Sequence, residues 1–183
     1  MTFKAPLVFV PGLLCDADLW AHQIMSLSDI ANIRVADTLA DDNIGAMAAR
    51  LLAEAPGRFA LAGLSMGGYV ALEVMRQAPD RVSHLALLST SAEKDTSKKK
   101  QIRKGLIKLA GKGNFRGVTP RLLRMLVHES HLNDLVLCDR ILKMAARVGR
   151  DCFIKQQRAI MMRKDCREVL INIKVPTLVL CGS

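Results

Sequence analysis

The sequence predicts an α/β protein, with a parallel sheet flanked by helices and a helical block inserted between two of its strands. Short apolar runs alternate with segments of helical spacing along residues 1–90, which is typical of βαβ units. Residues 91–168 lack such runs, and strand character returns near the end of the chain. We therefore divide the chain into the first part of the core (1–90), a basic helical lid (91–168) and a return strand of the core (169–183).

Four apolar runs in the first part are expected to form strands. The run Leu7–Val10 ends at Pro11–Gly12, and short runs bounded by turn residues are typical of buried parallel strands. Pro56–Gly57 ends the helical segment that precedes the third run. The expected strands are 7–10, 33–36, 59–64 and 82–88, and the expected helices are 17–28, 44–55 and 65–77.

The basic helical lid carries the whole positive charge excess of the protein. It contains 20 Lys or Arg and 8 Asp or Glu, a net charge of +12, whereas the rest of the chain has 7 basic and 9 acidic residues. Glycines separate its helical stretches, which are expected at 98–110, 119–130, 133–148 and 151–163, and the strand 175–182 follows. The first stretch has four apolar positions, Ile102, Leu106, Ile107 and Leu109.

Composition argues against several classes of protein. The chain begins without a basic region followed by a long apolar stretch, so no secretory signal is expected. No window approaches the roughly 18 apolar residues that would indicate a membrane span. The five cysteines are odd in number and lack CxxC spacing, which is typical of reduced thiols, so we expect a cytoplasmic protein.

A Gly-x-Ser-x-Gly pattern indicates where a catalytic nucleophile would lie. Gly63-Leu64-Ser65-Met66-Gly67 follows an apolar strand and precedes a helix, which is the setting of a nucleophile elbow. Such a turn holds the serine in a strained backbone conformation, and Gly63 and Gly67 let neighbouring backbone pass close by. The sequence therefore predicts Ser65 as a catalytic nucleophile. The alternative is an ordinary strand-to-helix turn with a capping serine.

The loop Val10-Pro11-Gly12-Leu13-Leu14 is the second candidate element. In a fold with such a turn, the loop after an early strand donates a backbone N–H to the oxyanion, beside the N–H of the residue after the nucleophile. These donors would be Leu13 and Met66, and Gly12 would allow the tight loop. The alternative is a plain strand-to-helix loop marked by Pro-Gly.

Together these residues resemble the α/β-hydrolase superfamily, and within it a bacterial group whose oxyanion loop reads VPGLLCD. Residues 10–16 carry that loop, Trp20 follows at the usual place, and residues 63–69 carry the elbow. The likeness covers essentially the whole chain. It also includes the lid exit at residues 157–161, 163 and 165, and the strand 175–182 that leads to the catalytic acid.

The resemblance also implies what the sequence does not contain. The superfamily usually has His-Gly where this chain and its subgroup have Pro11–Gly12. Its acid follows the strand 175–182 and its histidine comes later still, whereas this sequence ends at Ser183. The resemblance therefore implies a chain truncated at its C-terminus, without the final strand and helices and without the catalytic Asp and His.

Other residues are candidates to replace the missing groups. Asp95, just after the fourth strand, is an alternative acid. His128 and His131 are spaced to share a helix face, but no third ligand accompanies them, so no metal site is expected. A substitute base would have to be one of the histidines, His22, His84, His128 and His131.

The leading hypothesis is a serine-dependent hydrolase of small ester or related acyl substrates, with no metal or organic cofactor. The alternative is a truncated, non-catalytic remnant that only binds a ligand or a partner. The basic lid is expected either to be a solvated surface or to attract an anionic substrate or an acidic carrier. No nucleic acid partner is expected, because the lid lacks interleaved aromatics and recognition motifs.

Two expectations concern surfaces. No membrane partner is expected, because residues 98–110 combine Lys with Leu and Ile but have no Trp or Phe. The strand 175–182 is expected to be an unprotected apolar edge, and such edges invite pairing with another chain. We therefore expect a tendency to form a homodimer or to aggregate.

Overall fold

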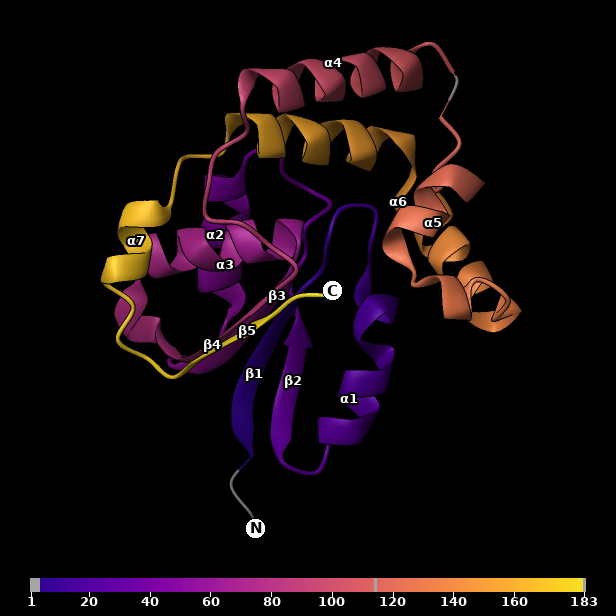
Figure 1. The fold of residues 1–183 in the computed structure, drawn as a ribbon. Helices are drawn as coiled ribbons and strands as arrows, with labels where there is room; N and C mark the ends of the chain where they lie inside the picture. The colour runs from indigo at the N-terminus through magenta and orange to yellow at the C-terminus, as the bar shows by residue number, and fades with distance from the viewer. Residues whose placement is uncertain (1–3, 114, 183) are drawn as a thin grey trace.

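The computed structural model describes residues 4–113 and 115–182. They form a five-stranded, all-parallel sheet with the strand order β2-β1-β3-β4-β5, so the predicted α/β fold is confirmed (Figure 1). The third and fourth expected strands match the observed bounds. The strands are β1 (Ala5–Val10), β2 (Ala31–Val35), β3 (Phe59–Leu64), β4 (Val82–Leu88) and β5 (Thr177–Leu180).

Helices connect the strands and cover both faces of the sheet. Figure 1 shows α1 on one side of the sheet and α2 and α3 on the other. The α-helices are α1 (Ala21–Leu27), α2 (Ile44–Glu54), α3 (Met66–Gln77), α4 (Ser97–Gly111), α5 (Pro120–Leu126), α6 (Leu135–Met162) and α7 (Arg167–Ile171). Short 3-10 helices are η1 (Ala17–Trp20), η2 (Pro79–Arg81) and η3 (Glu129–His131).

The two faces of the sheet contribute to two apolar clusters, because successive side chains of a strand point to opposite faces. Val8 and Val10 of β1 pack in the main core with α2 and α3. Phe9, between them, points to the other face and stacks on Trp20, with ring centroids 4.4 Å apart. Burial of both faces explains why β1 and β3 read as continuous apolar runs.

The helical block between β4 and β5 lies over the end of the sheet where the strands finish, with α4 beside α6 (Figure 1). It has its own apolar cluster, which includes Val148 and Phe153. Gly149 interrupts α6 with φ 75° and ψ 178°, a backbone conformation that L-residues avoid, so the expected break between 133–148 and 151–163 is present.

Several sequence expectations need correction. The stretch 119–130 is two elements, because α5 ends at Leu126 and η3 starts at Glu129. The helix expected from Ser65 begins at Met66, since Ser65 has a positive φ. The first turn of the helix expected at 17–28 is 3-10, and α7 was not expected, because its five residues are too few to show helical periodicity.

Strand β5 forms one edge of the sheet and pairs with β4 alone. Leu178, Val179 and Leu180 are 57%, 72% and 55% exposed, so the expected apolar edge is present. Association of two chains through this edge stays a prediction. All five cysteines carry free thiols. Within residues 4–113 and 115–182, no helix combines the length and apolar character needed to cross a bilayer.

Candidate active site

Ser65 lies in a sharp turn between β3 and α3. Its φ of 53° and ψ of −110° fall where L-residues are strained, and such strain persists only where surrounding contacts impose it. The Ser65 N–H donates to the Leu88 carbonyl at 2.9 Å, and the Thr90 hydroxyl donates to the Ser65 carbonyl at 2.8 Å. The Ser65 side chain makes no capping hydrogen bond to α3. This geometry argues against the alternative of a capping serine.

Two glycines make the turn possible. A Cβ on Gly63 would lie 2.8 Å from the Gly68 nitrogen, and a Cβ on Gly67 would lie 2.7 Å from the Val10 carbonyl carbon. Both distances are shorter than real Cβ contacts, and the obstructing atoms are backbone. The start of α3 therefore packs directly against the end of β1, which brings the loop after β1 to the nucleophile turn.

The loop after β1 lies beside Ser65. A Cβ placed on Gly12 would be 3.6 Å from the Ser65 Cβ, so the two backbones are close. Leu14 has φ 60°, an unusual conformation for a leucine that helps to turn this loop. Neither the Leu13 nor the Met66 N–H has an acceptor within the described part of the chain. Free donors next to Ser65 are what an oxyanion hole requires.

Gln156 of α6 holds this loop in place, and sequence reasoning missed it. Its side chain is fully buried; Oε1 accepts from the Leu14 N–H at 3.0 Å, and Nε2 donates to the Thr38 carbonyl at 3.3 Å. A glutamine inside an amphipathic helix carries no local signal of such a role. Its two partners lie 142 and 118 positions away in the chain.

Replacing Gln156 with methionine is expected to lower the free energy of unfolding by about 2 kcal/mol. The change keeps the side-chain volume but leaves two buried backbone groups without a partner. Urea denaturation followed by circular dichroism measures the loss. Gln101→Met, at an exposed position of α4, is the matched control and should change stability by less than about 0.5 kcal/mol. Equal stability of the two variants would contradict this role of Gln156.

An ion-pair cluster also joins the loop to α6. Arg147 Nε donates to the Asp16 carboxylate at 2.7 Å, and Arg147 Nη2 donates to the Asp18 carboxylate at 3.1 Å. Burial alone would raise the pKa of Asp16, but the hydrogen bonds from Arg147 and the Asp18 N–H, together with the charge of Arg147, hold that pKa below its ordinary value. The loop is thus fixed to the helical block at Leu14 and at Asp16.

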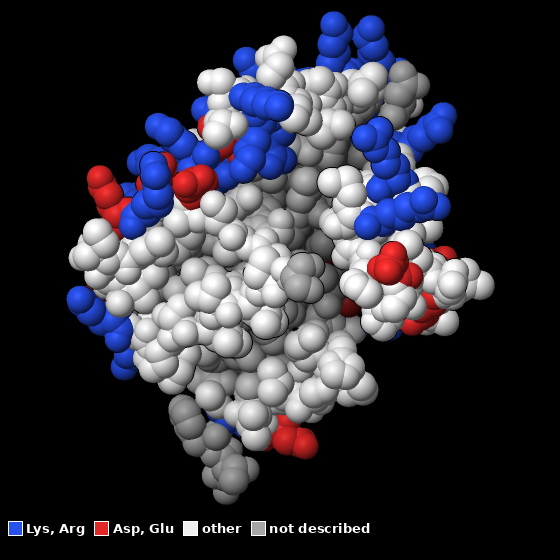
Figure 2. All heavy atoms as spheres, in the orientation of Figure 1, with Lys and Arg blue, Asp and Glu red and all other residues white. Residues whose placement is uncertain are grey.

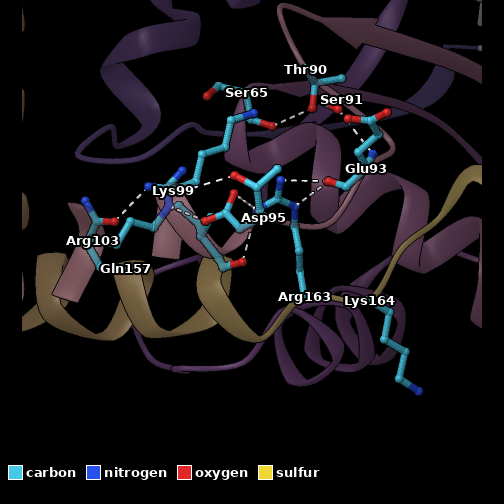
Figure 3. Close-up of polar contacts among 12 residues, drawn as sticks. Ser65, Thr90, Ser91, Glu93, Asp95, Lys99, Arg103, Gln157, Arg163 and Lys164 are labelled. Atoms are coloured by element: carbon cyan, nitrogen blue, oxygen red, sulfur yellow. Dashed lines mark hydrogen bonds and ion pairs between the residues drawn. The ribbon is translucent and has the colours of Figure 1, made fainter. Parts of the chain in front are cut away.

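Asp95, the alternative acid, is already paired. It is buried between Arg103 of α4, at 2.6 Å, and Arg163 at the end of α6, at 2.7 Å (Figure 3). Burial alone would raise the pKa of Asp95, but hydrogen bonds from Arg163 and Arg103 keep it below its ordinary value. Arg163 also lies 4.0 Å from the centre of the Tyr69 ring. Asp95 therefore joins α4 and α6 to the core and is not free to orient a histidine.

No histidine is bonded to Ser65 in the described residues. All four histidines are exposed; His84 Nδ1 lies 3.3 Å from Ser83 Oγ, and His128 Nδ1 lies 2.8 Å from Ser130 Oγ. The expectation that His128 and His131 share a helix face is wrong, because His128 has an extended backbone and caps a single 3-10 turn. Within the described ranges, no cluster of three metal-ligating side chains occurs.

A separate cavity of about 300 Å³ lies against α3 and does not include Ser65 among its lining residues. Its buried carboxylate, Glu73, accepts hydrogen bonds from Arg76 and Gln77. Burial alone would raise the pKa of Glu73, but these hydrogen bonds lower it. Because its buried charge is already compensated, this cavity is not assigned as a site.

The parallel sheet, the inserted helical block and the serine at the turn between β3 and α3 define the α/β-hydrolase fold, and this chain has that fold. It is similar to an esterase from Thermogutta terrifontis, with a TM-score of 0.83 and 23% identity over 100% of this chain and 72% of that chain. It is also similar to the enol-lactonase from Burkholderia xenovorans LB400, with a TM-score of 0.83 and 20% identity over 100% and 74% of the two chains.

A third solved structure, MenH from S. aureus, has a TM-score of 0.79 and 20% identity, covering 100% of this chain and 77% of that chain. Identities at this level establish the shared fold. No protein-family model matches the sequence, and no curated protein matches it.

Proposed function

We propose that the chain is a serine-dependent hydrolase of small ester or related acyl substrates. The observation that carries the proposal is the positive-φ turn that presents Ser65 beside the Gly12 loop. In this reaction Ser65 Oγ attacks the substrate carbonyl carbon, a base takes the hydroxyl proton, and the carbonyl electron pair moves onto oxygen. The proposed donors to that oxyanion are the N–H groups of Leu13 and Met66.

The surroundings of Leu13 support an apolar group on the substrate. Leu13 packs against both the main core and the apolar cluster of the helical block, which includes Val148 and Phe153. An acyl or alcohol group held beside the oxyanion would meet these side chains. The net charge of +12 on residues 91–168 would in addition favour the approach of anionic substrates.

Proton removal from Ser65 needs a base, and within residues 4–113 and 115–182 no histidine is bonded to Ser65. In the superfamily that the sequence resembles, the acid and the histidine follow the strand that corresponds to β5. Oxyanion stabilisation and binding alone can leave roughly 10³–10⁴-fold catalysis over water. We therefore expect slow but specific reaction at Ser65. The alternative, a non-catalytic ligand-binding chain, is favoured by the exposure of all four histidines.

Fluorophosphonate labelling with intact-mass detection tests the proposal. We expect one slow adduct that is lost in Ser65→Ala and retained in Ser130→Ala, which removes an exposed serine of η3. Circular dichroism would show that each variant is folded. A folded chain with no adduct at Ser65 would contradict the proposal for these residues and favour the ligand-binding alternative.

A further inference from the structure

Helix α4 exposes aliphatic side chains that its sequence pattern would have placed in a core. Ile102, Leu106 and Leu109 are 57%, 40% and 53% exposed. The spacing i, i+4, i+7 puts the three on one face of the helix. Ala110, which is buried, and Arg103, which pairs with Asp95, lie on the adjoining flank of the helix, about 80–100° around it from Ile102. The apolar stripe therefore lies on the exposed side of α4, next to the flank that packs on the helical block.

Lysines flank this stripe and occupy much of the rest of the exposed side of α4. Helix α4 contains no acidic residue, and five exposed lysines lie on or directly after it: Lys98, Lys99, Lys104, Lys108 and Lys112. None of them forms an ion pair with an acidic side chain in residues 4–113 or 115–182. Figure 2 shows blue side chains projecting from the upper rim of the molecule, where Figure 1 places α4.

We propose that the outer face of α4, named here the α4 surface and formed by Ile102, Leu106, Leu109 and the four lysines other than Lys104, docks reversibly on an anionic lipid surface. An amphipathic helix with aliphatic side chains flanked by lysines lies in the headgroup region, because the apolar side chains enter the acyl boundary while the ammonium groups remain among the phosphates. Each lysine near an anionic leaflet adds to the attraction. This proposal departs from the sequence-based expectation of no membrane partner.

The composition of the α4 surface favours lipid over an acidic protein. Protein interfaces are enriched in Tyr, Trp and Arg and depleted in Lys. Burying a lysine is unfavourable because its ammonium group loses hydration and its flexible side chain loses conformational entropy. The exposed positions of α4 carry only Lys as the basic residue and have no aromatic side chain. A headgroup layer keeps ammonium groups hydrated, so this composition suits it.

Co-sedimentation of the 183-residue chain with vesicles tests the proposal. We expect binding to vesicles of phosphatidylglycerol and phosphatidylcholine, little binding to phosphatidylcholine alone, and loss of binding in about 1 M salt, where charges are screened within a few ångströms. The double variant Ile102→Ser, Leu109→Ser is expected to bind at least about tenfold more weakly. Lys98→Gln with Lys99→Gln, the two exposed lysines that flank the stripe, should weaken binding by a similar factor.

Met25→Ser with Ile30→Ser is the matched control. These side chains are 71% and 65% exposed at α1 and the turn after it, away from α4 (Figure 1), so binding should be unchanged. All the substituted positions are exposed, and melting curves would show that each variant is folded. The proposal would be overturned if the chain bound neutral vesicles as strongly as anionic ones. It would also be overturned if the control variant lost as much vesicle binding as the α4 variants. Binding to polyglutamate without binding to vesicles would assign the α4 surface to an acidic protein instead.

Discussion

Replacing Gly67 with alanine is expected to lower the free energy of unfolding by about 4 kcal/mol or more, one of the largest effects of a single methyl group. The added Cβ would lie 2.7 Å from the Val10 carbonyl carbon and 2.8 Å from the Pro11 carbonyl oxygen. These are backbone atoms between the end of β1 and the candidate oxyanion loop, so α3 would have to move away from the sheet. Urea denaturation followed by far-UV circular dichroism measures the effect.

Gly105→Ala is the matched control for this substitution. Gly105 lies inside α4, and a Cβ there would meet no atom within 4 Å. Alanine is the better helix former, so this variant is expected to gain about 0.5–1 kcal/mol. If Gly67→Ala lost less than about 1 kcal/mol, the close approach of α3 and β1 would be wrong.

The second large effect is expected from Asp95→Asn, which removes a buried charge but keeps the side-chain shape. Asp95 and Arg163 have side chains that are 1% and 5% exposed and lie 2.7 Å apart. Without the carboxylate, Arg163 would be left as an uncompensated buried cation, which costs about 3–5 kcal/mol. Asp139→Asn is the control, because its pair with Lys143 is 57% and 68% exposed and should contribute about 0.5 kcal/mol or less.

The same pair predicts a dependence of stability on pH. The pKa of Asp95 is lower in the folded chain than in the unfolded chain, because the hydrogen bonds from Arg163 and Arg103 outweigh its burial. Its stabilising contribution is therefore complete above the ordinary aspartate pKa of about 4, and is lost as the pH falls below that value through the folded-state pKa. Urea midpoints should converge for wild type and Asp95→Asn at low pH. A difference between the two urea midpoints that stayed constant down to the lowest measurable pH would contradict this assignment.

These two substitutions act on the two supports of the candidate site. Gly67 sets the distance between the Ser65 turn and the loop after β1, whereas Asp95 joins the helical block to the core. The helical block in turn holds the loop through Gln156. A loss of labelling at Ser65 in either variant would therefore be interpretable only where the variant remains folded.

The sequence by itself determined the features that depend on neighbouring residues. Apolar runs bounded by turn residues correctly predicted the bounds of β3 and β4, and Gly149 indicated the break in α6. The Gly-x-Ser-x-Gly pattern located the strained turn, because only small residues at 63 and 67 let the chain pass so close to itself. Local periodicity and turn chemistry depend on residues that are close in sequence, so they can be recognised without knowledge of the fold.

The tertiary structure alone decided which distant residues meet. Nothing near Gln156 in the sequence indicates that its side chain accepts from Leu14, and nothing near Asp95 indicates two arginine partners on separate helices. The pattern of α4 likewise gave its apolar positions but not which of them would face outward, as Ile102 does. Contacts between residues far apart in the chain depend on how helices pack over the sheet, and that packing leaves no periodic signal in either segment.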